Sequence, residues 1–404
     1  QLVSLCGSMM QSATILWHVT LLCEPESKGA ALAMVGAVKV VPIIVCSLIG
    51  GAVADTFDRR RLLICLNLLL GALATWIWWS TKQGSLNLVG LYTLAGAASV
   101  LNAFEAPARM ALVPTLVPEK DLPHAISLNM ILFQGAAVGG PALAGVVMAW
   151  LGLEWCYLLN ALSFVGVVLA LVSMRPREIV RSVTARVSLS SIAEGLRFVW
   201  RHDLIRSSML LDFLATFFAS AVGLLPMVTQ DVLGLGNDEN AYGLLVAAQA
   251  IGAFAASLVL ADVTPRIVSR GRVLVASVLV YGVATIAFGM TTSYWVMFAC
   301  LAVSGAADTV SAVLRNLIRQ LGTPDHLRGR MSSVNMVFFM GGPQLGELEA
   351  GLVAQRFGAP LSIATGGIGC VLATLWIAAK TPRLRSYRRD DPVLEPVLGE
   401  GRAA

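Results

Sequence analysis

Charged residues are scarce in this sequence. Asp, Glu, Lys and Arg make up only 13% of its 404 residues, whereas 57% are hydrophobic and the mean hydropathy is +0.76. Soluble domains carry about 25% charged residues, so a water-facing globule of this size would lack the polar surface that keeps a protein dissolved. The 37 glycines agree with this, because membrane helices tolerate glycine better than soluble helices do. We therefore predict an all-α membrane protein that crosses the bilayer many times.

Sequence patterns for metals, disulfides and nucleotides are missing too. The seven cysteines are scattered singly and form no CxxC or CxxH pair, so neither a metal site nor a disulfide framework is indicated. No GxxxxGK[ST] loop occurs, which argues against an ATP-driven pump. No catalytic triad or metal-ligand spacing points to an enzyme. We expect no catalytic residue, no metal and no cofactor.

Twelve apolar segments are long enough to cross a bilayer, which takes roughly 20 mostly apolar residues. The first opens on QLVSLCGSMM with no Met or basic stretch before it. No cleavable signal peptide is therefore indicated, and we expect a sequence truncated within its first helix. Short turns separate several neighbours, so these helices run antiparallel. The predicted spans are 1–22, 30–54, 62–80, 87–106, 124–150, 155–174, 204–229, 241–262, 273–291, 294–312, 332–354 and 360–379.

The basic residues predict which side of the membrane each connection occupies. One set of connections holds nearly all of them, and we assign Arg109, Arg315 and Arg319 to that set. The opposite set holds only Lys28, Lys82 and Arg356. Basic connections remain in the cytoplasm, so both termini are predicted to be cytoplasmic. The net charge of +5 thus reflects topology and does not indicate a nucleic-acid partner.

An internal repeat appears when the sequence is compared with itself after the shift that carries residue 109 onto 315. Arg109 then meets Arg315, and Asn129–Met130 meets Asn335–Met336. Four glycines also match, namely Gly135, Gly140, Gly145 and Gly152 with Gly341, Gly346, Gly351 and Gly358. The shift keeps the orientation of the spans, so the chain is predicted to form two parallel-repeat six-helix bundles. This is the architecture of major facilitator transporters, whose substrate cavity lies between the bundles near the midplane.

The predicted domain boundaries follow from this repeat. Residues 1–174 form the first bundle, 175–203 a cytoplasmic linker, 204–380 the second bundle and 381–404 a cytoplasmic tail. Within the linker, SLSSIAEGLRFVW (188–200) has apolar residues near helical spacing, which predicts an amphipathic helix on the inner membrane surface. From Tyr387 on, mixed charges with Pro and Gly predict a disordered tail.

The charged stretch GGAVADTFDRRRLL (50–63) resembles the signature that follows the second helix of the major facilitator superfamily. The matching residues are Gly51, Asp55, Arg59, Arg60 and Arg61, whereas Asp58 stands where the family often has Gly. The segments FEAPARMALVPTLV (104–117) and TPDHLRGRMSSVN (323–335) are similar to the branch of enterobactin exporters, macrolide efflux proteins and lysophospholipid transporters. The resemblance covers nearly the whole chain. It implies a secondary transporter, with a proton as coupling ion and a monomer as the default state.

The resemblance also implies that this charged turn latches the two bundles on the cytoplasmic side. Asp55 would approach the amino terminus of span 11, where a carboxylate is stabilised by about 0.3–1 kcal/mol. Glu105, at the cytoplasmic end of span 4, is the expected acceptor for Arg59. The alternative is a topogenic turn that only stops the helix from slipping.

Span 5 contains AAVGGPALAG (136–145), which is similar to the antiporter motif GxxxGPxxGG associated with exporters. Gly140, Pro141 and Gly145 match, whereas Ala136 and Ala144 replace two of its glycines. The alternative role is ordinary helix packing, because small residues one turn apart let another helix approach closely.

Ionisable residues inside the spans are candidates for a proton or substrate site, because charges at membrane depth usually face a cavity or a partner. Asp212 lies about two turns into span 7, Asp308 near the inner end of span 10, and Glu347 in the outer part of span 11. Gln11 and Asn102 are further cavity candidates, in spans 1 and 4. Structural pairing, for example of Glu347 with Lys39, is the alternative. The Arg that many proton-driven exporters carry in the middle of span 4 is missing, which leaves the coupling mechanism open.

Together these features favour a proton-coupled exporter of small amphipathic molecules, such as a drug, siderophore or natural product, in the cell membrane. The low number of fixed charges disfavours highly charged substrates. One alternative is a transporter of lysophospholipids or other lipids with the same fold. The other is a non-transporting membrane scaffold or sensor, for which a two-state latch would have little use.

Overall fold

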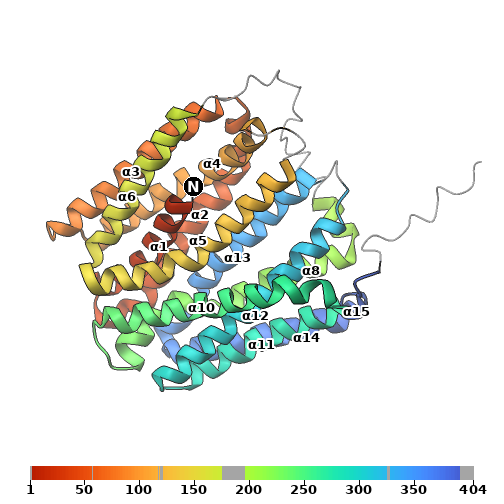
Figure 1. Ribbon diagram of the computed structural model, residues 1–404. Coiled ribbons are helices and arrows are strands. Elements are labelled where there is room, and N and C mark those ends of the chain that lie inside the picture. Colours follow the sequence, from red (N-terminus) through yellow and green to blue (C-terminus); the bar gives the residue numbers. More distant parts are fainter. Residues whose placement is uncertain are drawn as a thin grey trace, which may run out of the picture.

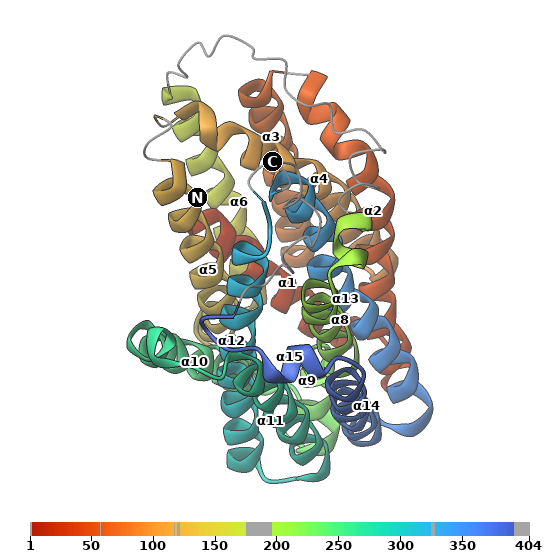
Figure 2. The same ribbon diagram turned by 90° about the vertical axis from the view of Figure 1, so that its right-hand side faces the viewer.

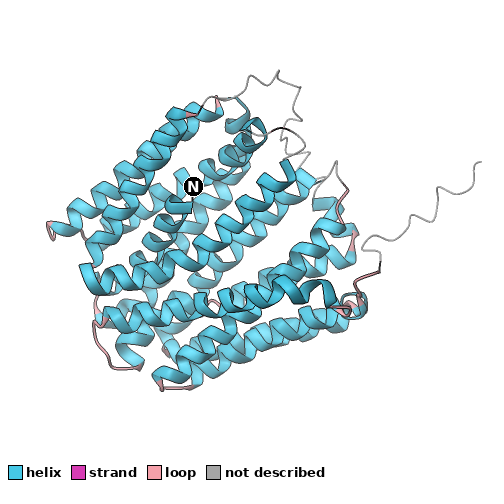
Figure 3. Ribbon diagram, viewed as in Figure 1, coloured by secondary structure: helices cyan, strands magenta, loops and turns pink. Residues whose placement is uncertain are grey.

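The structure, a computed structural model, describes residues 2–56, 58–116, 118, 122–174, 196–324 and 328–391. These residues form helices joined by short loops and contain no strand (Figure 3). By length and apolar composition, eight of the helices described are able to cross a membrane. The all-α prediction is therefore confirmed.

The first bundle contains six long helices. Asp58 caps the third of them, because its side chain accepts a hydrogen bond from the backbone N–H of Arg61. Gly152, with φ of +100°, makes the tight turn between the last two. The helices are α1 (Leu2–Leu22), α2 (Lys28–Thr56), α3 (Arg59–Lys82), α4 (Leu88–Leu116), α5 (Leu122–Leu151) and α6 (Leu153–Ser173), and η1 (Pro25–Ser27) joins α1 to α2.

The second bundle repeats this plan with one interrupted helix. Its first span breaks near Gly223 and Pro226 into α8 (Asp203–Phe218), η3 (Ala221–Leu224), α9 (Leu225–Met227) and η4 (Val228–Val232). Pro226 lacks the N–H that a continuous helix needs. The remaining elements are α10 (Glu239–Val263), η5 (Thr264–Arg266), α11 (Arg270–Met290), α12 (Tyr294–Leu321), α13 (Arg328–Phe357), α14 (Ala359–Lys380) and α15 (Pro382–Ser386).

The twelve predicted spans all appear as helical segments in the described residues, but two of the predicted spans end too early. Helix α4 ends at Leu116 and α12 at Leu321, well beyond the predicted ends at residues 106 and 312. Arg109, Arg315 and Arg319 therefore lie inside helices, so their assignment to connections was wrong. A span read from hydropathy stops at the first arginine, whereas an arginine with an acidic partner can continue the helix.

The two bundles lie side by side, with the red-to-yellow helices in one group and the green-to-blue helices in the other (Figure 1). Helix α2 packs against α13, and α5 packs against α10, so these four helices form the seams between the bundles (Figures 1 and 2). Gly145 of α5 and Gly243 of α10 cross so closely that a Cβ on either would overlap the backbone of the other. Small residues thus set the distance between the bundles.

Several polar contacts join the two bundles at one end of the molecule. We call the end where α6 finishes and α8 begins the linker end, and the end where α1 finishes and α2 begins the closed end. At the closed end Lys28 forms an ion pair with Asp231 at 2.5 Å, and Gln230 donates to Thr20 at 3.1 Å. Five pairs of residues in the half of the molecule nearest this end are joined by hydrogen bonds or an ion pair between the bundles. These pairs are Lys28–Asp231, Thr20–Gln230, Ala13–Tyr242, Glu26–Gln355 and Ala30–Gln355.

The predicted linker and tail are only partly described. Residues 196–201 are helical, whereas 175–195 lie outside the described residues. The tail is ordered as far as residue 391, so the disorder predicted from Tyr387 was wrong for this stretch. Tyr387 is 3% exposed and its carbonyl accepts from the backbone N–H of Gly271, which places α15 against α11 and α14 (Figure 2). Arg389 donates to Asp390, and this hydrogen bond lowers the pKa of the Asp390 carboxyl.

Candidate functional site

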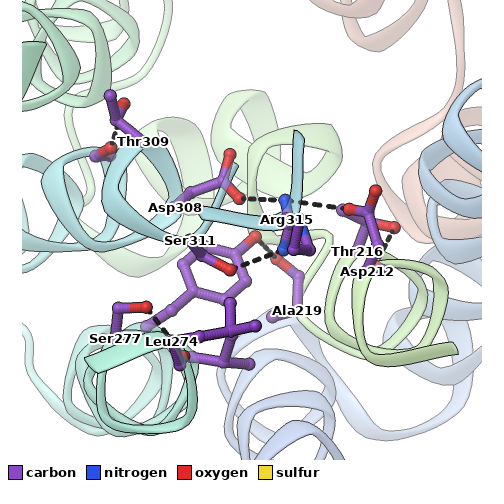
Figure 4. A network of polar contacts seen from close by, with 12 residues as sticks. Asp212, Thr216, Ala219, Leu274, Ser277, Asp308, Thr309, Ser311 and Arg315 are labelled. Carbon is purple, nitrogen blue, oxygen red and sulfur yellow. Dashed lines mark hydrogen bonds and ion pairs between the residues drawn. The ribbon is translucent and has the colours of Figure 1, made fainter. Parts of the chain in front are cut away.

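Four charged side chains of α8 and α12 meet inside the second bundle, and we call them the charge cluster: Asp212, Asp308, Arg315 and Arg319. Nη2 of Arg315 lies 2.9 Å from Oδ1 of Asp212 and 3.4 Å from Oδ1 of Asp308 (Figure 4). Nη1 of Arg319 lies 3.5 Å from Oδ2 of Asp212. Arg315 also donates to the hydroxyl of Ser311 at 2.7 Å. Two positive and two negative charges thus balance within the membrane-embedded bundle.

The two aspartates of the cluster have different surroundings. The side chain of Asp212 is 6% exposed and that of Arg315 is 3% exposed, so this pair is withdrawn from solvent. The side chain of Asp308 is 42% exposed, although Asp308 lies at the midpoint of α12. A charged group at membrane depth is too costly to face lipid. Asp308 is therefore not expected to face lipid, whereas Asp212 holds the arginines in place.

The sequence contained a signal for this cluster. Asp308, Ser311, Arg315 and Arg319 are spaced by three, four and four residues, which places all four side chains on one face of a helix. The prediction placed Asp308 near the inner end of a short span, because that span was ended at residue 312. With α12 extended to Leu321, the same residue lies at the middle of the helix.

The first bundle has a simpler arrangement at the repeat-related positions. Arg109 pairs with Glu105 of its own helix at 2.9 Å, and both side chains are largely buried. The repeat shift carries Glu105 onto Ser311 and Arg109 onto Arg315. Asn102, at the position related to Asp308, is exposed at the midpoint of α4. The structure thus gives Glu105 a partner within α4, and the predicted Arg59–Glu105 contact stays a prediction.

The charged turn between α2 and α3 is partly described. Gly51 and Asp55 belong to α2, but their side-chain surroundings lie outside the described part of the chain. Arg60 donates to the carbonyls of Leu171 and Val172 at 2.7 and 2.8 Å, so it satisfies carbonyl groups near the end of α6. Arg61 is exposed. At least one arginine of this turn therefore has a structural role that the sequence did not indicate.

The antiporter-like motif lies where α5 contacts two other helices. A Cβ on Gly140 would lie 2.5 Å from the Cβ of Met9 and 2.7 Å from the carbonyl of Cys6, so Gly140 permits close packing on α1. Gly145 makes the crossing with Gly243 in the other bundle. Pro141 lies inside α5. These close contacts explain why small residues occupy these positions, and a role in antiport stays a prediction.

Two further candidates have polar atoms buried between helices. Gln11 of α1 accepts a hydrogen bond from Asn160 of α6 at 2.6 Å and is 7% exposed, so it ties two helices of one bundle together. Glu347 of α13 has a buried Oε2 atom without a hydrogen-bond partner. No ion pair links Glu347 to Lys39, although both residues are described, so the structure does not support that alternative.

Comparison with known proteins assigns this architecture. The family model described as transmembrane secretion effector matches residues 1–395. The chain belongs to the transmembrane secretion effector family. This family is part of the major facilitator superfamily of transporters, so the predicted family and fold are confirmed and the protein is a multi-pass membrane transporter, not an enzyme.

Relatives in this family agree along most of the chain. The multidrug efflux pump Tap of Mycolicibacterium fortuitum is 28% identical over 374 residues, which cover 89% of this chain and 90% of the relative. The enterobactin exporter EntS of Citrobacter koseri is 25% identical over 374 residues, with coverage of 90% and 86%. The crystal structure of the D-xylose–proton symporter shares the fold, with a TM-score of 0.70 at 13% identity over 96% of this chain and 98% of that chain.

Proposed function

We propose that this chain is a secondary active exporter of small amphipathic molecules, coupled to protons, in the plasma membrane. The observation that carries the proposal is the exposure of Asp308, 42% at the midpoint of a membrane-spanning helix. We infer from this exposure that Asp308 is a charged, water-accessible group between the two bundles, which are joined at one end. Such a geometry is what a transporter needs to admit a substrate from one side only.

The family supports the direction of transport. Both relatives named above carry names that describe export, a multidrug efflux pump and an enterobactin exporter. We infer the same direction here, with the linker end in the cytoplasm because the basic connections lie there. Both termini would then be cytoplasmic, and the structure would represent the state that is open toward the cytoplasm. We propose that the protein acts as a monomer.

The charged turn would close the linker end in the opposite state. Helix α2 ends at Thr56 and α13 begins at Arg328, and these antiparallel neighbours bring both positions to the linker end. An acidic residue near the start of α13 is stabilised by the partial positive charge of that helix terminus. We propose that Gly51, Asp55 and Arg59–Arg61, together with Glu105, form this gate.

The substrate is expected to be amphipathic and uncharged or cationic. Asp308 and Asn102 are exposed polar positions at the midpoints of α12 and α4, whereas the helices around them are mostly apolar. A lipophilic cation would place its charge near Asp308 and its apolar part against the walls. Arg315 is already neutralised by Asp212, so a strongly anionic substrate would find no free positive partner in the described cluster.

The test is export from proteoliposomes under an imposed pH gradient. Lipophilic cations, macrolides and catecholate siderophores are loaded, and their loss is followed with the gradient in each direction. We expect export of at least one class, faster when the receiving side is acidic. A wild-type protein that moves none of them but moves a fluorescent lysophospholipid would replace this proposal with lipid transport. A folded protein that moves neither would leave the non-transporting scaffold.

A further inference from the structure

Glu347 lies at the seam between the bundles, next to two glycines that make room for its side chain. A Cβ on Gly36 of α2 would lie 3.2 Å from the Cβ of Glu347, and a Cβ on Gly223 of η3 would lie 3.0 Å from its Cγ. Gly36 belongs to the first bundle and Gly223 to the second. The side chain therefore occupies the space where α2, α13 and the broken span meet, in the half of the molecule that is closed.

Two buried acceptor atoms at this seam have no donor. They are Oε2 of Glu347 and Oε1 of Gln344, which are three residues apart and so share one face of α13. A buried acceptor without a donor is costly, and the cost is larger when the group is charged. An ionised Glu347 would be an acceptor only, whereas a protonated Glu347 carries an O–H donor. Protonation therefore removes the charge and supplies the donor that the site lacks.

Among the described side chains of the neighbouring helices, the charged groups already have other partners or form no ion pair with this carboxylate. On α2, Lys28 is paired with Asp231, and Lys39 forms no ion pair with Glu347. On α8, Asp212 is paired with Arg315 and Arg319, and on α14 the Cys370 thiol contacts the carbonyl of Val278. On α10, the hydroxyl of Tyr242 already donates to the carbonyl of Ala13.

We propose that Glu347 is a proton-binding site whose protonation permits the two bundles to close at this end. When the end opens, the α2–α13 seam admits water, and the carboxylate can lose or gain a proton from that aqueous phase. When the end closes, the Oε2 atom of Glu347 is buried without a donor, and a bound proton removes the charge beside it. This inference rests on the proposed function for its meaning in transport, because proton uptake at the outer side would then shift the equilibrium toward the inward-open state.

The experiment measures closure directly and needs no substrate. Hydrogen–deuterium exchange of the full chain in lipid nanodiscs is followed by mass spectrometry at several pH values, after correction for the pH dependence of the chemical exchange rate. The reporting segments are residues 28–36 of α2 and 347–357 of α13. In the wild type we expect protection to be high at acidic pH and to be lost as the pH rises.

The decisive variant is Glu347→Gln, a neutral residue of the same size. We expect it to stay protected at every pH, and Glu347→Ala to behave in the same way. Glu349→Gln, on the same helix, and Asp231→Asn, at the closed-end ion pair, should keep the pH dependence of the wild type. A Glu347→Gln protein that opens with pH as the wild type does would overturn the inference, as would a wild type whose protection does not change with pH.

This inference and the proposed function fail in different ways. If the wild type exports substrates while Glu347→Gln keeps a normal pH response, Glu347 is not the proton site but the transporter remains. If the wild type exports nothing while Glu347→Gln abolishes its pH response, the proton site remains and the proposed function falls.

Discussion

At repeat-related positions, the two bundles pair a buried arginine with an acid in different ways. Arg109 of α4 takes its acid from four residues earlier in its own helix, where Glu105 lies 2.9 Å away. Arg315 of α12 has Ser311 at that position and takes its acid from another helix, where Asp212 lies 2.9 Å away. One arginine is thus satisfied within a helix, and the other joins two helices of its bundle.

The difference between these two ion pairs indicates where a change of charge can alter the position of one helix relative to another. A pair within one helix moves with that helix and is unchanged when helices shift. A pair between α8 and α12 depends on the position of both, and Asp308 adds an exposed acid to it. Of these two arrangements, the one in the second bundle is therefore the one in which a change of charge alters helix packing.

The largest expected effect comes from removing the acid between helices. Asp212→Asn leaves Arg315 and Arg319 without their buried partner, and breaking a buried pair in this way costs about 3–5 kcal/mol in the free energy of unfolding. Glu105→Gln should cost only about 1–2 kcal/mol, because its partner can remain hydrogen-bonded within the helix. Chemical denaturation in detergent micelles measures both.

The control for this comparison restores the balance of charge. Asp212→Asn combined with Arg319→Gln leaves one arginine and one aspartate in the cluster, so part of the lost stability should return. Equal losses for Asp212→Asn and Glu105→Gln would show that the two arrangements are equivalent in energy.

A second variant converts one arrangement into the other. Ser311→Glu gives Arg315 the partner that Arg109 has, four residues earlier in the same helix. In the Asp212→Asn background it should recover about 2 kcal/mol of the loss, because a buried charge regains a hydrogen-bonded partner. Ser311→Gln, which has the size but not the charge, should recover less than half as much. If both recover the same amount, volume rather than charge explains the effect.

The sequence was sufficient for the fold because the fold depends on long apolar runs and on a repeat of glycine and arginine positions. It was less informative about the site. Asp212 and Asp308 were identified because acids inside apolar runs are conspicuous, but their partners were assigned to connections. Arg315 ends an apolar run in the sequence and is buried in the structure, and only the distance to Asp212 reveals this.

The contacts at the seams between the bundles could not be predicted from the sequence, for a similar reason. Gly145 and Gly243 are far apart in the chain, and neither indicates its partner. Glu347 was expected to pair with Lys39 if it was structural, yet it lies beside Gly36 and Gly223 with a buried oxygen lacking a donor. The contact between two glycines or around one acid depends on how the bundles are placed.

The third prediction replaces the exposed residue at the midpoint of α12 with the residue found at the repeat-related position of α4. Asp308→Asn makes α12 resemble α4, which carries Asn102 there. Because the side chain of Asp308 is 42% exposed, the loss in unfolding free energy should stay below about 1 kcal/mol. Binding of a lipophilic cation should weaken about tenfold, which corresponds to ~1.4 kcal/mol. Isothermal titration with cationic and neutral substrates measures this. Equal weakening for both substrates would show that Asp308 shapes the site without recognising charge.

The smallest effect is expected at the closed end, where Lys28 and Asp231 form an ion pair between the bundles instead of within one. The side chain of Asp231 is 41% exposed, so Lys28→Met should cost about 0.5 kcal/mol, the usual range for a partly solvated pair. In the proposed alternation this pair exists only while that end is closed, so its whole energy would act on the balance between the two states. A shift of about 0.5 kcal/mol changes the ratio of closed to open molecules by roughly a factor of two.

Hydrogen–deuterium exchange at residues 28–36 would detect this change in the ratio. By comparison, Asp212→Asn should destabilise the bundle far more and shift the ratio less. The exchanged pair Lys28→Asp with Asp231→Lys should restore the wild-type ratio, and its failure to do so would mean that the contact is not electrostatic.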